Sequence, residues 1–196
     1  MRCVIVAGGD LEVSLPQYDF LICADSGYRH LRGVVPDLIV GDFDSYKGEL
    51  PDTEIMKLPS QKDETDLYFA CKEAVRRGAR EVILLGVTGD RPDHTYAAYS
   101  CLQLLKENDV KAKIITKNSE ITLVSNETLR ILKDESYVSV LPFGGCAEVT
   151  LKGFLYPLKK TRLSMSFPVG VSNEFVEDIA TVKVRKGSVL IMKVKK

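Results

Sequence analysis

The sequence predicts an α/β N-terminal domain, with a mostly parallel sheet and helices on both faces, followed by an all-β sandwich C-terminal domain. In the first two thirds of the chain, short apolar runs alternate with segments whose apolar residues recur at helical spacing, which is typical of parallel sheets flanked by helices. After about residue 117 the helical spacing disappears, and short β-branched segments separated by turns follow, as in small antiparallel sandwiches. We place the domains at residues 1–125 and 126–196.

The elements of the first domain follow in order from apolar runs and helical stripes. Strands are predicted at residues 3–7, 20–23, 38–40, 54–58, 82–85 and 113–116. One helix is predicted to begin near residues 63–66 and to stop at Gly78, because apolar residues recur between them at helical spacing. A second helix is predicted from about Asp93, where another apolar stripe begins.

The second domain is predicted from short β-branched segments alone. Its strands are expected at residues 121–124, 129–132, 137–141, 147–151 and 189–194, with residues 142–145 as a turn between two of them. A domain of about 70 residues buries proportionately little surface. Packing against the first domain or a second subunit would compensate for this, so we expect a homodimer.

The composition limits the classes of partner and compartment. Among 196 residues, 27 basic side chains balance 27 acidic ones, which argues against a nucleic acid or an anionic membrane as the main partner. Five cysteines without a CxxC pair are typical of a reducing compartment. The apolar run at residues 3–7 is too short for a signal peptide, and no run approaches the length of a membrane span. We therefore expect a cytoplasmic protein.

Two carboxylates follow the strand predicted at residues 38–40. After Gly41, Asp42 and Asp44 stand at positions i and i+2, at the end of a strand where open α/β sheets bind ligands. Two such carboxylates repel each other unless a cation lies between them, and a hard cation with oxygen ligands is the natural candidate. The alternative is that both residues are turn formers.

Glycine-rich and acidic turns follow several of the predicted strands, although the chain has neither a GxxxxGK[ST] loop nor a complete GxGxxG fingerprint. Turns at one edge of a doubly wound sheet converge on one crevice. Asp63 and Asp66 either cap the first helix and complement its dipole or present two carboxylates to that crevice. Arg91 and His94 flank the second helix start, after a glycine turn whose N–H groups suit a phosphate. An acidic metal site facing an arginine suits polyphosphate chemistry.

At this point the chain resembles the thiamine pyrophosphokinase family. The order and spacing agree over nearly the whole chain in the motifs Ala24-Asp25-Ser26-Gly27, Gly41-Asp42-Phe43-Asp44-Ser45, Asp63-x-Thr65-Asp66, Gly89-x-Arg91-x-Asp93-His94, Gly153-Phe154-Leu155-Tyr156 and Ser172-Asn173-Glu174-Phe175. The resemblance implies Mg-dependent transfer of the pyrophosphoryl group of ATP to the hydroxyl of thiamine, giving thiamine diphosphate and AMP. It also implies a homodimer with active sites between subunits, the first domain binding ATP and Mg and the second binding thiamine.

The resemblance also assigns roles to residues by position. We expect metal ligands at Asp42, Asp44 and Asp63, and catalytic roles for Asp63, Asp66, Asp93 and Arg91. We expect ATP contacts from Asp25, Ser26, Thr88, Arg91 and His94, and thiamine contacts from Tyr156, Ser172 and Asn173. One of Asp63, Asp66 and Asp93 is expected to accept the proton of the substrate hydroxyl, and the sequence does not choose among them.

Some positions depart from the family pattern. Asp90 replaces the usual second glycine before the arginine, Pro92 replaces an apolar residue, and Leu155 stands where a basic residue is common. Two alternatives therefore accompany the leading hypothesis. One is another Mg-dependent phospho- or pyrophosphotransferase that acts on a small alcohol. The other is a non-catalytic module that binds a nucleotide or thiamine.

Overall fold

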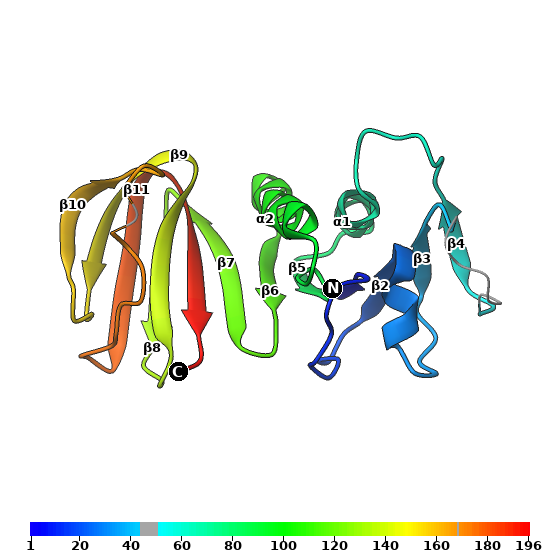
Figure 1. Cartoon of the computed structure of the whole chain (residues 1–196), viewed down its shortest axis with the longest axis horizontal. Coiled ribbons are helices and arrows are strands. Elements are labelled where there is room, and N and C mark those ends of the chain that lie inside the picture. The colour runs from blue at the N-terminus through cyan, green and yellow to red at the C-terminus, as the bar shows by residue number, and fades with distance from the viewer. Residues whose placement is uncertain (44–50, 168) are drawn as a thin grey trace. The chain divides into compact units, whose positions relative to one another are not determined.

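The computed structural model of the chain describes residues 1–43, 51–167 and 169–196 (Figure 1). The chain forms two compact units, Met1–Lys117 and Asn118–Lys196. Within the described ranges, no helix is long and apolar enough to cross a membrane.

The first unit contains a parallel sheet. Its strands are β1 (Arg2–Val6), β2 (Phe20–Ala24), β3 (Leu38–Gly41), β4 (Glu54–Lys57), β5 (Glu81–Leu85) and β6 (Lys111–Ile115). They lie in the order β6, β5, β1, β2, β3, β4, and each neighbouring pair is parallel. The central strands β1 and β2 are almost fully buried, which explains why their sequences are continuous apolar runs.

The two faces of this sheet are covered differently. The helices α1 (Asp66–Arg76) and α2 (Pro92–Glu107) pack together on one face, where the thiol of Cys71 interacts with Cys101 and Cys3. The other face carries a core cluster against which the segment containing Leu11 and Tyr18 packs. Among the described residues, the helix on that face is the short 3-10 helix η1 (Asp25–His30) rather than an α-helix.

Both α-helices begin where local chemistry favours a start. Thr65 is the N-cap of α1, and its hydroxyl accepts a hydrogen bond from the backbone N–H of Tyr68 at 3.2 Å. Helix α1 therefore begins at Asp66, and Asp63 precedes it without capping it. Pro92 is the first residue of α2, a position that needs no N–H donor. The fixed φ of Pro92 thus supports the helix start after the glycine turn.

The second unit is antiparallel. Its strands are β7 (Ser119–Ser125), β8 (Thr128–Leu132), β9 (Tyr137–Lys152), β10 (Leu158–Leu163) and β11 (Ile179–Val194). They lie in the order β10, β9, β11, β7, and β8 pairs with the first part of β11. The inward-facing residues form one core cluster, which includes Val140, Val149, Leu151, Phe154, Val182 and Ile191.

The turn expected at residues 142–145 is wrong as a strand boundary. These residues lie within the single strand β9, and Pro142 and Phe143 pair with Val189 and Ser188 of β11. The register then shifts before Glu148, in the stretch that contains Gly144 and Gly145, which adopt φ of 70° and 144°. Glycine permits such an excursion without ending the strand. The turn signal therefore marks an irregularity inside one long strand.

Candidate functional site

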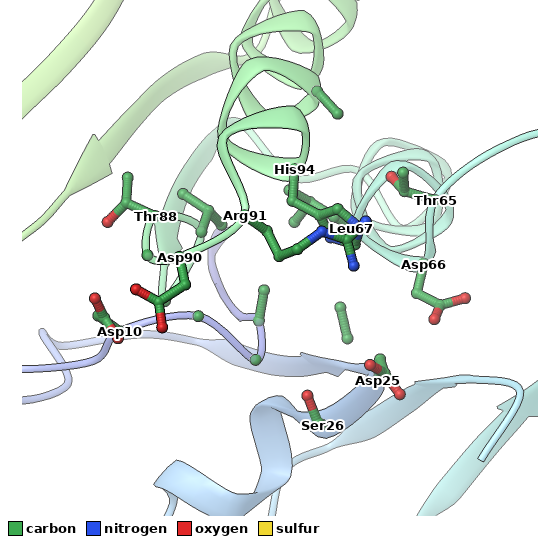
Figure 2. A pocket seen from close by; sticks show the side chains of 18 residues that line it. Asp10, Asp25, Ser26, Thr65, Asp66, Leu67, Thr88, Asp90, Arg91 and His94 are labelled. Atoms are coloured by element: carbon green, nitrogen blue, oxygen red, sulfur yellow. The ribbon is translucent and has the colours of Figure 1, made fainter. Parts of the chain in front are cut away.

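A cavity of about 360 Å³ lies in the first unit, at the carboxyl ends of its central strands. Its wall is made by the turns after β1, β2 and β5 and by the starts of α1 and α2 (Figure 2). The lining residues include Gly8, Gly9, Asp10, Asp25, Ser26, Thr65, Asp66, Gly86, Thr88, Gly89, Asp90, Arg91 and His94. The predicted convergence of turns on one crevice of the sheet is therefore present in the structure.

The glycine turns form a tightly packed floor. A Cβ on Gly8 would lie 1.9 Å from Oγ of Ser26, and a Cβ on Gly9 would lie 2.3 Å from the carbonyl oxygen of Thr88. The Gly9 N–H donates to the Gly86 carbonyl and the Asp10 N–H to the Thr88 carbonyl, both at 2.7 Å. Backbone oxygens therefore exclude a side chain at Gly9, whereas a side chain at Gly8 would require the Ser26 hydroxyl to move.

A lysine joins two carboxylates beside the cavity. The Nζ atom of Lys62 lies 3.3 Å from Oδ2 of Asp42 and 2.9 Å from Oδ1 of Asp66. The three side chains are only 11%, 23% and 16% exposed, respectively. Oδ1 of Asp66 is buried, and its partner among the described residues is the Lys62 ammonium, in an ion pair that lacks good hydrogen-bond geometry. A buried carboxylate oxygen in this condition is suited to a cation.

The electrostatics of this group follow from burial and from its neighbours. Burial raises the pKa of Asp66, and the carboxylates of Asp25 and Asp42 raise it further, while Lys62 opposes the shift. For Lys62, burial lowers the pKa, but the two carboxylates outweigh it, so the net pKa is raised. The ammonium therefore stays charged and relieves the repulsion among three carboxylates.

The three metal ligands expected from the sequence do not lie together in the described structure. Asp42 lies in the group held by Lys62, Asp44 lies outside the described residues, and Asp63 is exposed and does not line the cavity. The described residues contain no preformed cluster of three or more His, Cys, Asp or Glu side chains around a cation position. The carboxylate that joins Asp42 is Asp66, and these two fit a hard cation because both present oxygens to a common positive group.

Arg91 and Asp93 form an exposed ion pair at the start of α2. Nε and Nη2 of Arg91 donate to the two carboxylate oxygens of Asp93 at 3.0 and 2.6 Å. This pairing holds the pKa of Asp93 well below its usual range. Asp93 is not part of the cavity lining. In Figure 2 the Arg91 side chain extends from the helix start over the cavity, with Asp25 and Asp66 across from it.

The five residues expected to contact ATP all line this cavity: Asp25, Ser26, Thr88, Arg91 and His94. Lys62 and the cap residue Thr65 were missed by the sequence reasoning. A lysine directly before an acidic pair was the available signal for Lys62, but its contact with Asp42 joins residues 20 positions apart. The sequence contains Thr65 within the motif Asp63-x-Thr65-Asp66, but the motif does not predict that Thr65 caps the helix.

The three residues expected at the thiamine end lie together in the second unit. The side-chain amide of Asn173 accepts from the backbone N–H of Tyr156 at 3.0 Å and donates to the Tyr156 carbonyl at 2.8 Å. It also accepts from the Glu174 N–H at 3.0 Å, and Asn173 is 5% exposed, whereas Tyr156 is 64% exposed. Ser172 takes part through its backbone N–H, which donates to Oγ of Ser139 at 3.0 Å. Asn173 thus holds the backbone that carries an exposed tyrosine.

Comparison with known proteins gives two family matches. The family described as "Thiamin pyrophosphokinase, catalytic domain" matches residues 11–114, and the family described as "Thiamin pyrophosphokinase, vitamin B1 binding domain" matches residues 120–189. A curated thiamine pyrophosphokinase of Bacillus subtilis is 30% identical over an alignment that covers 96% of this chain and 95% of that protein.

Solved structures agree with these matches. The crystal structure of thiamine pyrophosphokinase from Bacillus subtilis superposes with a TM-score of 0.89 at 27% identity and covers 100% of both chains. The thiamin pyrophosphokinase from Geobacillus thermodenitrificans superposes with a TM-score of 0.83 at 29% identity, covering 100% of this chain and 98% of its own.

Proposed function

Because the chain belongs to the thiamin pyrophosphokinase family, we propose that it transfers the pyrophosphoryl group of ATP to the hydroxyl of thiamine, giving thiamine diphosphate and AMP. The observation that carries this proposal is the succession of two matched domains, one catalytic and one for vitamin B1, along nearly the whole chain. The cavity of the first unit supports it independently, because its floor, its helix start and its arginine suit a polyphosphate.

ATP is proposed to occupy this cavity with its phosphates over the glycine turns. The turns bring backbone close to the ligand at Gly8 and Gly9, and the start of α2 adds positive potential. The planar guanidinium of Arg91 donates two hydrogen bonds to Asp93. Because the Arg91 side chain is exposed, the guanidinium can rotate to bind a phosphate instead. Its charge then stabilises the negative charge of the transferring group in the transition state.

We propose Mg²⁺ as the cofactor, held by Asp42 and Asp66, with Asp44 retained from the sequence motif. When bound there, the ion would supply positive charge that neutralises the phosphate oxygens. Two features of the chain support a cation at this place. Oδ1 of Asp66 is buried, and the carboxylates of Asp42 and Asp66 both lie within 3.3 Å of the ammonium of Lys62. Asp63, which is exposed, stays proposed as a metal ligand, and Asp63, Asp66 and Asp93 stay the candidates for accepting the proton of the substrate hydroxyl.

The second unit is proposed as the thiamine-binding side, with Tyr156, Ser172 and Asn173 near the ligand. An exposed aromatic ring suits the fixed positive charge of thiamine. We also propose that this unit is a β-sandwich. The support is that β7 and β8 pair with different halves of β11, and that the register of β11 against β9 shifts between those halves, where a strand can pass from one sheet to another.

A homodimer is part of this proposal, with active sites between subunits. Several large apolar side chains of the second unit are exposed, among them Tyr156, Met165, Phe167 and Val171. We propose that these side chains belong to one apolar patch, since contiguous patches of this kind are typical of protein interfaces. Sedimentation equilibrium measures the oligomeric state, and a fully active monomer would contradict this part of the proposal.

The activity is tested by incubating the protein with ATP, Mg²⁺ and thiamine and identifying both products. We expect AMP and thiamine diphosphate in equal amounts, with no product in the absence of thiamine. Formation of ADP and a monophosphate would show transfer of a single phosphoryl group and would overturn the proposal. Tight binding of thiamine without turnover would indicate a binding module instead.

A further inference from the structure

Lys62 occupies the position between the carboxylates that are proposed to hold the divalent cation. Its ammonium lies within 3.3 Å of Asp42 and 2.9 Å of Asp66, and it also donates to the carbonyl oxygen of Pro59 at 3.2 Å. Only 11% of its side chain is exposed. The ammonium is therefore placed by three oxygen atoms rather than left in solvent.

This position cannot be shared with a divalent cation. An ion bound to the same carboxylate oxygens would lie within a few ångström of the ammonium, in a partly buried setting where repulsion between like charges is strong. The carboxylates of Asp25 and Asp42 also repel the carboxylate of Asp66. In the metal-free protein, the Lys62 ammonium supplies a positive charge to Asp42 and Asp66 at this place.

We propose that Lys62 is an internal counter-ion that competes with the divalent cation: it holds Asp42 and Asp66 in the metal-free protein and leaves them when the metal enters. The inference rests on the proposed metal site. Lys62 precedes the first turn of α1, and its ammonium is carried by a flexible four-carbon side chain. The ammonium can therefore move without a change in the helix. The polyphosphate of the incoming metal–nucleotide complex offers it a new anionic partner in the adjoining cavity. Lys62 therefore lowers the affinity for the free metal and favours binding of the metal together with the nucleotide.

The test measures metal binding directly, without turnover. Binding of Mn²⁺ to the nucleotide-free protein is followed by the loss of its free-ion electron paramagnetic resonance signal. We expect Lys62→Met and Lys62→Gln to bind Mn²⁺ at least about fivefold more tightly than the wild type, because a competing charge at contact distance is removed. Lys62→Arg keeps the charge and should bind Mn²⁺ like the wild type. Lys111→Met removes an exposed lysine of the same unit and should have no effect.

Thermal unfolding provides a second measurement with its own sign. In EDTA, Lys62→Met and Lys62→Gln should unfold at a lower temperature than the wild type, because Asp42 and Asp66 then lose their ion pairs with the Lys62 ammonium. Saturating Mn²⁺ should raise the Tm of these variants more than it raises that of the wild type. The glutamine amide hydrogen-bonds carboxylates without charge, so Lys62→Gln keeps the test available if Lys62→Met does not fold.

The outcomes separate this inference from the proposed function. Unchanged or weaker Mn²⁺ binding in the neutral variants, with normal binding in the wild type, would overturn the competition and leave Lys62 as a structural residue. If Asp42→Asn and Asp66→Asn bind Mn²⁺ as well as the wild type does, the metal assignment itself is wrong and the inference falls with it. The proposed transfer of the pyrophosphoryl group is tested separately, by AMP formation in the wild type, and neither outcome decides it.

Discussion

Replacing Asn173 with alanine is expected to destabilise the second unit, because its side chain acts as a structural bridge. The amide makes three hydrogen bonds, two of them to the backbone of Tyr156, with donor–acceptor distances of 2.8 to 3.0 Å. Alanine makes none of them. The N–H groups of Tyr156 and Glu174 and the Tyr156 carbonyl then lose their partner.

The size of the effect follows from these bonds. A hydrogen bond of this kind contributes about 1 kcal/mol net, and a polar group left buried without a partner costs about 1–3 kcal/mol. Because Tyr156 is 64% exposed, water replaces part of what its backbone loses. We therefore expect the free energy of unfolding to fall by about 2–3 kcal/mol. Asn173→Asp retains the acceptor but not the donor, so its loss should be smaller.

The assay is urea unfolding followed by circular dichroism, with Ser172→Ala as the matched control. The Ser172 hydrogen bond to Ser139 uses the backbone N–H, so alanine retains it and stability should change by less than about 0.5 kcal/mol. Steady-state kinetics then measure the effect of each substitution on substrate binding, apart from its effect on stability. Both variants should raise the KM for thiamine and leave the KM for ATP unchanged. An Asn173→Ala protein as stable as the wild type would refute the bridge.

Three further predictions concern the first unit. Asp66→Asn should lower kcat, measured by AMP formation, about a thousandfold or more, because a proposed cation ligand worth several kcal/mol is lost. Circular dichroism should show that the protein stays folded. A near-normal kcat would mean that Asp66 serves only at the start of the helix. Arg91→Lys keeps the charge but loses the planar fork, so kcat/KM for ATP should fall about tenfold or more, and an unchanged value would place Arg91 away from the phosphates. Burial raises the pKa of Cys23 from 9.0 to about 12, so the folded protein keeps a proton that the unfolded chain loses above pH 9. The protonated thiol's contribution to the free energy of unfolding is complete below pH 9 and is lost as the pH rises toward 12. Between pH 8 and pH 10, the free energy of unfolding of the wild type in urea should therefore fall by about 1 kcal/mol more than that of Cys23→Ala. Equal decreases would contradict the raised pKa.

The central strands and the placement of the cavity could be predicted because their signals are local. The runs that form β1, β2, β3 and β5 are apolar on both faces, which is typical of buried parallel strands. The turns after them reach one crevice because parallel strands end at one edge. These two regularities place the turns at one crevice, while the resemblance to the family selected the residues in them that are expected to contact ATP.

Other features depend on contacts that no local pattern contains. Spacing alone puts Asp63 and Asp66 on one helix face, but the cap at Thr65 starts α1 later and leaves Asp63 outside it. Strand β10 (Leu158–Leu163) stands at one end of the strand order and carries two lysines and an arginine, as edge strands often do, so it lacks an apolar pattern. The first half of β11 was missed although Ala180, Val182 and Val184 alternate inward, a signal that was available.

The hydrogen bonds between the turns after β1 and β5 have a consequence for how a ligand is received. They continue the ladder of the sheet past its last strand residues, from Ala7 through Gly9 to Asp10. Amide protons there should exchange with solvent as slowly as those of the sheet, even without nucleotide. The floor thus exists before the ligand arrives, so binding carries little entropic cost of ordering it. Changes in ligand preference are then expected from the opposite wall, at the start of α2, where side chains rather than backbone meet the cavity.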